Sequence, residues 1–288
     1  METALSATAF ERTDFSHPVF GPVRAHLRQL ARTPGWPDCD RLNALAAIPP
    51  RTARGHPLRF VPPAPDGVHY ELRIHDSGHV CTRPQNWHDL FNALAWLAFP
   101  RTKAALNARH AARLPAEGGQ RSRLRDLLTI FDEGGAIVLC ADPALEALVR
   151  AHDWRALFWQ RRASLQSDFR VFVAGHAVLE QALEPWPGIT CKAVFVPMPA
   201  DRLAQPAAVL IGHADDAAAQ WIEALDEAAT PACLQPLPVF GLPGWHPGTA
   251  NEAFYEDTRY FRPFRRPAGG RKAVKLRRES AGQPLSST

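Results

Sequence analysis

The sequence contains no apolar run close to the roughly 18 residues that a membrane-spanning helix requires. Its N-terminus, METALSATAFERTDF, has neither a basic segment nor an apolar stretch, so it does not resemble a secretory signal. Five cysteines occur in 288 residues without a C-x-x-C pair, which argues against a disulfide framework or a zinc ribbon. We therefore expect a folded cytoplasmic protein with reduced thiols and no membrane span.

The motifs that identify several common enzyme classes are also missing. The chain has no G-x-G-x-x-G, G-x-x-x-x-G-K-[ST], G-x-S-x-G or H-E-x-x-H sequence. The sequence therefore lacks the patterns that normally indicate dinucleotide-binding, P-loop, serine-hydrolase and zincin enzymes. The composition, 46% hydrophobic and 22% charged, is ordinary for a globular protein and predicts a real core without indicating a function.

Basic charge is concentrated at the C-terminus. Residues 262–288 hold eight Lys and Arg side chains and one acid, so residues 1–261 carry 25 of the 33 basic and 28 of the 29 acidic side chains. The body of the protein is therefore slightly acidic. The tail, which contains Gly269, Gly270 and a Ser-rich end, is predicted to be disordered, with contact to nucleic acid or another anionic partner as the alternative.

Composition divides the chain into three regions. Residues 1–66 are rich in proline and are predicted to form an N-terminal arm with short helices near residues 22–32 and 40–47. Residues 67–261 form the predicted core domain, and residues 262–288 form the tail. Within the core, the longest coherent stretch is NWHDLFNALAWLAFPRTKAALNARH, from Asn86 to His110.

This stretch predicts a bent pair of helices. Asn86 is a suitable cap, Asp89 can complete a capping box, and Pro100 ends one helix while suiting the first turn of the next. Helical spacing places His88 near Asn92 on the first helix. It places Lys103, Asn107 and His110 on one face of the second helix. Either these polar groups form a hydrogen-bond network that fixes the bend, or they form one wall of a ligand or metal site.

The segments around the helix pair predict strands. Residues 68–74 and 79–83 are expected to form one β-hairpin, and residues 127–131 and 136–140 a second, with Asp132 and Glu133 at its turn. Further strands are expected at residues 168–175, 189–196 and 207–212, and further helices are expected at residues 143–162, 176–183 and 215–228. The ordered loop at residues 236–248 is expected to pack through Phe240 and Trp245.

These elements favour an α+β fold: a single domain of β-hairpins and a mixed sheet packed against the buried bent helix pair. The unit at residues 169–184, a strand followed by Gly175 and a helix, keeps a doubly wound α/β fold as the second choice.

His176 and Glu180 are four residues apart, so they lie on one helical face, as two ligands of a metal ion would. A structural histidine with a salt-bridging glutamate explains the same spacing. The candidate metal ligands are His88, His176, Glu180 and Asp132. Glu133 or Glu180 would be the general base for a metal-bound water, and Lys103 would stabilise an oxyanion. Without metal, His88 or His176 would be the acid or base, polarised by Asp89 or Asp132.

Two functions follow from these residues. The first is a hydrolase that depends on one divalent metal ion and acts on a small-molecule or anionic substrate, with Asn92, Asn107 and His110 as further polar groups of the site. The second is a non-catalytic protein that binds nucleic acid or another anionic partner. The acidic balance of the body argues mildly against the second function.

Four blocks of the chain, TRPQNWHDLFNALAWLAFPRTKAALNARH, LLTIFDEGGAIVL, VFVAGHAVLE and LPGWHPGTANEAFYEDTRYFRP, resemble a known family. It is the proteobacterial domain-of-unknown-function family numbered three thousand and twenty-five, and the resemblance extends over about residues 20–265. It implies that the polar residues named above belong to recurring motif blocks of that family. It implies no particular reaction.

Overall fold

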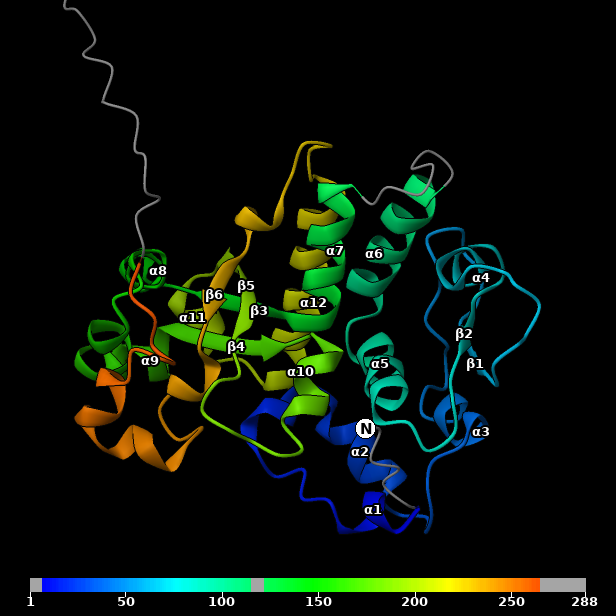
Figure 1. Ribbon diagram of the computed structural model, residues 1–288, viewed down its shortest axis with the longest axis horizontal. Helices are drawn as coiled ribbons and strands as arrows, with labels where there is room; N and C mark the ends of the chain where they lie inside the picture. The colour runs from blue at the N-terminus through cyan, green and yellow to red at the C-terminus, as the bar shows by residue number, and fades with distance from the viewer. Residues whose placement is uncertain (1–6, 115–121, 265–288) are drawn as a thin grey trace, which may run out of the picture.

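The computed structural model describes residues 7–114 and 122–264 (Figure 1). A mixed sheet of four strands has the order β4-β3-β5-β6, where the strands are β3 (Gly135–Cys140), β4 (Phe169–Val173), β5 (Cys191–Pro197) and β6 (Gln235–Leu237). β3 runs parallel to β5 and antiparallel to β4, and β6 runs antiparallel to β5. Helices cover this sheet, which confirms the predicted α+β class and the mixed sheet.

β3 is buried on both faces, and its side chains alternate between two hydrophobic clusters. Ile137 and Leu139 pack with α7 (Arg123–Gly134) and α12 (Ala207–Glu223). Ala136 and Val138 pack on the other side, in a cluster that includes α5 (Trp87–Ala98) and the N-terminal and C-terminal segments. The sheet is therefore the middle layer of the core.

The N-terminal region belongs to the same core. Val19, Phe20 and Leu27 are almost fully buried against α5 and the sheet. The segment contains α1 (Ala7–Arg12), η1 (Pro18–Val23), α2 (Arg24–Leu30) and α3 (Cys39–Asn43). At the other end, Phe240 is fully buried within short 3-10 turns, so the proline-rich loop packs as expected.

The predicted bent helix pair is confirmed. α5 (Trp87–Ala98) is capped by the Asn86 side chain, which accepts from the backbone N–H of Asp89. α6 (Pro100–Arg113) follows at once, because Phe99 leaves helical geometry and Pro100 occupies the first turn. Figure 1 shows the pair lying between α7 and α4 (Tyr70–Ser77). The second helix is slightly longer than expected and ends at Arg113.

The first predicted hairpin is wrong. Residues 70–77 form a helix, α4 (Tyr70–Ser77), which is capped by the His69 side chain and ended by Gly78 in the left-handed region at φ 76°. The strand after it, β2 (His79–Cys81), pairs in parallel with β1 (Arg59–Val61). The unit is therefore a strand, a crossover helix and a parallel strand. Residues 70–77 form a helix because the two boundary signals, the His69 cap and Gly78, outweigh the strand preference of the β-branched and aromatic residues between them.

The second predicted hairpin is also wrong. The apolar run that precedes β3 belongs to α7, which is capped by the Ser122 side chain. Its buried residues, Leu124, Leu127, Leu128 and Phe131, recur at helical spacing, and a window restricted to residues 127–131 hides this period. Asp132 and Glu133 therefore lie in the last turn of α7 and not at a hairpin tip.

Residues 207–212 are not a strand but the first turns of α12, which starts earlier than predicted and ends at Glu223. Leu210 and Ala214 continue the buried face toward Ile222, so one helix explains both segments. The strands β4 and β5 and the helices at residues 143 and 176 agree with expectation. The remaining helical segments are α8 (Pro143–Ala151), η3 (Ala156–Gln160), α9 (Arg162–Asp168), α10 (His176–Gln181), α11 (Ala200–Leu203), η4 (Pro231–Cys233), η5 (Val239–Gly241), η6 (Pro247–Ala250) and η7 (Glu252–Glu256).

Within the two described ranges, no helix combines the length and apolar character needed to cross a membrane. Most of the predicted basic tail, residues 265–288, lies outside the described residues.

Candidate functional site

Polar side chains from α4, α5, α6, α7 and α10 meet beside the start of β3. α10 packs against α5 and α7, and a tight backbone junction brings its first residue to the end of α7. The N–H groups of Ala174 and Gly175 both donate to the Gly135 carbonyl, at 3.0 and 2.9 Å. A Cβ on Gly175 would lie 2.5 Å from the Glu133 carbonyl oxygen, so glycine is needed for this close approach. The junction fixes the position of His176.

Two histidines form the centre of the site. Nε2 of His88 lies 3.1 Å from Nε2 of His176, and the rings are nearly perpendicular, with centroids 4.5 Å apart. On the far side of each ring a carboxylate faces Nδ1. Glu180 Oε2 is 3.0 Å from Nδ1 of His88, and Asp132 Oδ2 is 3.9 Å from Nδ1 of His176. We name this series Glu180, His88, His176 and Asp132 the carboxylate-histidine chain.

The carboxylate-histidine chain runs from the surface into the protein. The side chains of Glu180 and His88 are 41% and 37% exposed, whereas that of His176 is 6% exposed and that of Asp132 is 20% exposed. Water or a ligand can therefore reach the Glu180 end, while the Asp132 end is largely shielded.

Burial controls the charge of the inner histidine. Desolvation lowers the pKa of His176 to about 4, Asp132 opposes this, and Lys103 and His88 add to it. His176 is therefore neutral at pH 7. Burial alone would raise the pKa of Asp132, but Lys103 and then His176 hold it below its ordinary value. Asp132 is therefore a buried carboxylate that remains charged.

The positions of the acceptors decide where the ring protons lie. The carboxylate and the backbone carbonyl of Asp132 lie near His176 and favour a proton on its Nδ1, although this buried atom forms no hydrogen bond among the described residues. With the proton on Nδ1, Nε2 of His176 has a lone pair. Glu180 likewise favours a proton on Nδ1 of His88. Two lone pairs facing each other at 3.1 Å would repel, so either one Nε2 carries a proton that it donates to the other, or a metal ion lies between them.

Lys103 joins this chain to a buried network in the helix pair. Its ammonium donates to Asp132 Oδ1 at 2.5 Å and to Asn92 Oδ1 at 2.8 Å, and it lies 5.6 Å from the centre of the Trp96 ring. The side chain is only 7% exposed. Its role as an oxyanion stabiliser remains a prediction, and the contacts seen here serve to hold Asp132.

The network continues to two residues that the sequence interpretation missed. Asn92 Nδ2 donates to the Tyr70 hydroxyl at 2.7 Å, and Asn107 Nδ2 donates to Glu71 Oε2 at 2.7 Å. Burial raises the pKa of Glu71, and the hydrogen bond from Asn107 partly offsets this. Tyr70 and Glu71 were missed because their segment was expected to be a strand. The helix signals at residues 69 and 78 would have placed both residues on one helix.

His110 lies close enough to Asp132 to lower the pKa of that carboxyl and is itself buried. Two other candidates have different surroundings. Asp89 binds the Arg83 side chain through both carboxylate oxygens and accepts from the Arg83 backbone N–H at 2.7 Å, in place of the expected bond to Asn86. Glu133 has an exposed side chain, and its backbone carbonyl packs against Gly175.

The four predicted metal ligands meet, but not around one point. Glu180 and Asp132 lie behind the two imidazoles, on the Nδ1 side, and only the two Nε2 atoms face each other. Within residues 7–114 and 122–264, no group of three or more His, Cys, Asp or Glu side chains is arranged to hold a metal ion. Metal binding therefore remains a prediction that needs a measurement.

The fold and the site define a helix-rich α+β domain with an ordered polar network that reaches the surface at one end. The model of one family, described as protein of unknown function (DUF3025), matches residues 58–265. This match covers more than half of the chain, so the chain belongs to that family, as the resemblance of its motif blocks predicts. The matched region begins later than the expected residue 20. No curated protein and no solved structure matches the chain.

Proposed function

We propose that this protein is a hydrolase that uses the carboxylate-histidine chain for acid-base catalysis, with Glu180 as the residue that exchanges protons with substrate and water. The observation that carries the proposal is the unbroken contact from exposed Glu180 through His88 to buried His176, at 3.0 and 3.1 Å. A surface ion pair alone would not need a second, buried histidine with its own carboxylate.

The arrangement can hold one dissociable proton between Glu180 and His88. With the proton on His88, Glu180 is a carboxylate; with the proton on Glu180, His88 is neutral and keeps its Nε2 proton directed at His176. Glu180 can therefore protonate a leaving group and afterwards regain a proton from the attacking water. His176, held neutral by burial, keeps an acceptor in place for His88. Lys103 keeps Asp132 charged behind it.

A second candidate is the metal-dependent version of the same reaction. Two imidazole nitrogens on one zinc ion, with bonds near 2.05 Å and a tetrahedral angle, would lie roughly 3.3 Å apart. The observed separation of the Nε2 atoms of His88 and His176 is 3.1 Å. A carboxylate behind each imidazole is the usual outer-shell partner of a metal-bound histidine. The ion would supply a polarised water, while Glu180 and Asp132 would orient the two rings.

The acid-base proposal is tested with chromogenic esters, amides, phosphate esters and glycosides. Wild type is compared with Glu180→Gln, His88→Gln and Glu184→Gln, the last being a matched exposed glutamate just beyond α10. We expect Glu180→Gln and His88→Gln to lose about 100-fold or more in kcat/KM for any substrate that wild type cleaves, with Glu184→Gln unchanged. Full activity in Glu180→Gln, or no turnover of any class by wild type, would contradict the proposal.

The two versions are separated by elemental analysis of protein purified without a histidine tag. Near-stoichiometric metal in wild type that is lost in both His88→Ala and His176→Ala, with circular dichroism showing that each is folded, selects the metal-dependent version. Protein that stays metal-free after incubation with zinc, manganese or iron, yet is active, selects the metal-free version.

A further inference from the structure

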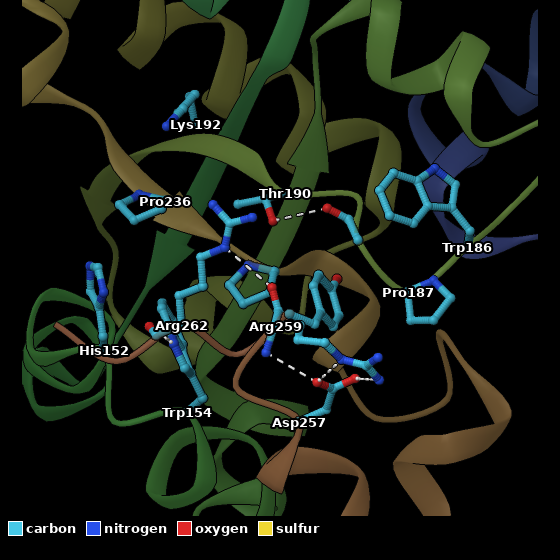
Figure 2. Close-up of a pocket in the computed structure, with 13 residues that line it drawn as sticks. His152, Trp154, Trp186, Pro187, Thr190, Lys192, Pro236, Asp257, Arg259 and Arg262 are labelled. Carbon is cyan, nitrogen blue, oxygen red and sulfur yellow. Dashed lines mark hydrogen bonds and ion pairs between the residues drawn. The ribbon is translucent and has the colours of Figure 1, made fainter. Parts of the chain in front are cut away.

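A cavity of about 600 Å³ lies between the strands β5 and β6, the end of α8 and the C-terminal segment (Figure 2). None of the residues that line it belongs to the carboxylate-histidine chain. Its volume falls in the range of pockets that enclose small organic ligands. The cavity is therefore large enough to be a ligand site separate from the carboxylate-histidine chain.

The cavity carries positive charge that the surrounding protein does not neutralise. Of its charged lining residues, Asp257 and Arg259 form a bidentate pair with each other, at 2.9 Å for both contacts. In the described part of the chain, no carboxylate lies within ion-pair distance of Lys192 or Arg262. Two cations thus line the same cavity, and the carboxylate among its lining residues, Asp257, is already paired with Arg259.

Two hydrogen bonds, one through its backbone and one through its side chain, hold Arg262 in position. Its carbonyl accepts from the Trp154 indole N–H at 2.8 Å, and its Nε donates to the Arg259 carbonyl at 3.2 Å. Figure 2 shows the guanidinium reaching into the cavity between Pro236 and Thr190. One edge of the guanidinium is therefore fixed, and its two terminal amino groups remain to bind an oxyanion in a bidentate manner.

The other lining groups are mostly rings. Trp186 is 55% exposed and lies across the cavity from Lys192 (Figure 2). A Cβ on Gly188 would overlap the Trp186 ring, at 1.6 Å from Cζ3, so glycine lets the ring lie where it does. The Tyr260 hydroxyl already donates to the Ile189 carbonyl at 2.8 Å, so this residue offers only its ring to a ligand. Trp186 provides a broad apolar face on which a planar group can stack.

We propose that this cavity binds a small anion that carries a planar aromatic ring, with its phosphate or carboxylate on Arg262 and Lys192 and its ring against Trp186. A nucleoside monophosphate and an aromatic carboxylate share this chemistry. A neutral aromatic molecule leaves both cations unpaired, and inorganic phosphate leaves the ring face unused. The proposal does not depend on the hydrolase proposal, because no residue is shared between the two sites.

The proposal is tested by isothermal titration calorimetry of the full chain. The probes are the four common ribonucleoside monophosphates and indole-3-carboxylate, each compared with the matching neutral nucleoside or indole, and inorganic phosphate alone. We expect saturable binding of at least one aromatic anion, about tenfold or more tighter than its neutral counterpart and than phosphate. Preference for the monophosphates or for the carboxylate identifies the source of the anion.

Variants locate the binding. Lys192→Gln and Arg262→Gln should each weaken it about tenfold, and Trp186→Ala should weaken it while leaving any binding of phosphate unchanged. Arg54→Gln, which replaces an exposed arginine that pairs with Asp76, is the matched control and should bind as wild type does. Thermal unfolding checks that each variant is folded. Binding of no aromatic anion, equal binding of the neutral counterpart, or unchanged binding in Lys192→Gln and Arg262→Gln would each overturn the proposal.

Discussion

Removal of the buried charge at Asp132 should strongly destabilise the protein. Asp132 accepts from Lys103 at 2.5 Å, and their side chains are only 20% and 7% exposed. In Asp132→Asn the Lys103 ammonium stays buried, keeps its bond to Asn92 and loses its counter-charge. Breaking one side of a buried ion pair costs about 3–5 kcal/mol, and because the introduced amide can still accept a hydrogen bond we expect the lower end, about 3 kcal/mol.

Urea denaturation at pH 7 measures this loss. Lys103→Met should cost a similar amount, because it leaves the Asp132 carboxylate buried without its cation. The double variant Lys103→Met/Asp132→Asn should be destabilised by clearly less than the sum of the two single changes, since no unpaired charge remains. As a control, Asp76→Asn removes one side of the Arg54–Asp76 pair, whose side chains are 57% and 56% exposed, and should cost under about 1 kcal/mol. A free energy of unfolding for Asp132→Asn within about 0.5 kcal/mol of wild type would show that Lys103 does not need the Asp132 charge.

Two further predictions concern His176 and its junction. Because the pKa of His176 is lowered from 6.5 to about 4, the unfolded state binds a proton first as the pH falls below 6.5. This histidine should remove up to about 3 kcal/mol of stability between pH 6.5 and pH 4, and His176→Gln should show a flatter stability profile in urea titrations across that range. Gly175→Ala should cost about 1–3 kcal/mol, because its Cβ would meet the Glu133 carbonyl oxygen at 2.5 Å. An unchanged Tm in Gly175→Ala would show that the junction is less tight than described.

The sequence was most informative where several local signals agreed. At residues 86–110 the Asn86 cap, the apolar pattern and Pro100 all indicate the same bent pair, and the structure confirms it. At residues 70–77 the β-branched and aromatic residues favour a strand, but the His69 cap and Gly78 favour a helix, and packing against α6 decides for the helix. Short apolar runs such as residues 127–131 carry too little periodicity to separate a strand from a helix.

The chemistry of the site was partly predictable from residue type, but its geometry was not. The spacing of His176 and Glu180 suggests a shared partner, yet that partner is His88, 88 residues away from His176 in the chain. Only the packing of α10 on α5 brings them together. Asp132 was named as a candidate for a wrong local reason, because it lies at the end of a helix and not at a turn. No local pattern in the sequence indicates that each carboxylate lies behind an imidazole.

The site depends on one proton or metal ion between the Nε2 atoms of His88 and His176, with each Nδ1 facing a carboxylate. Long-range ¹H–¹⁵N NMR of the imidazoles in metal-free protein shows which ring nitrogens carry protons, and it is recorded for wild type, Glu180→Gln and His88→Ala. We expect His176 to stay neutral from pH 8 to pH 5 with its proton on Nδ1, and Glu180→Gln to change the ¹⁵N shifts of His88. A proton on Nε2 of His176, or ¹⁵N shifts of His88 that are the same in wild type and Glu180→Gln, would contradict this arrangement.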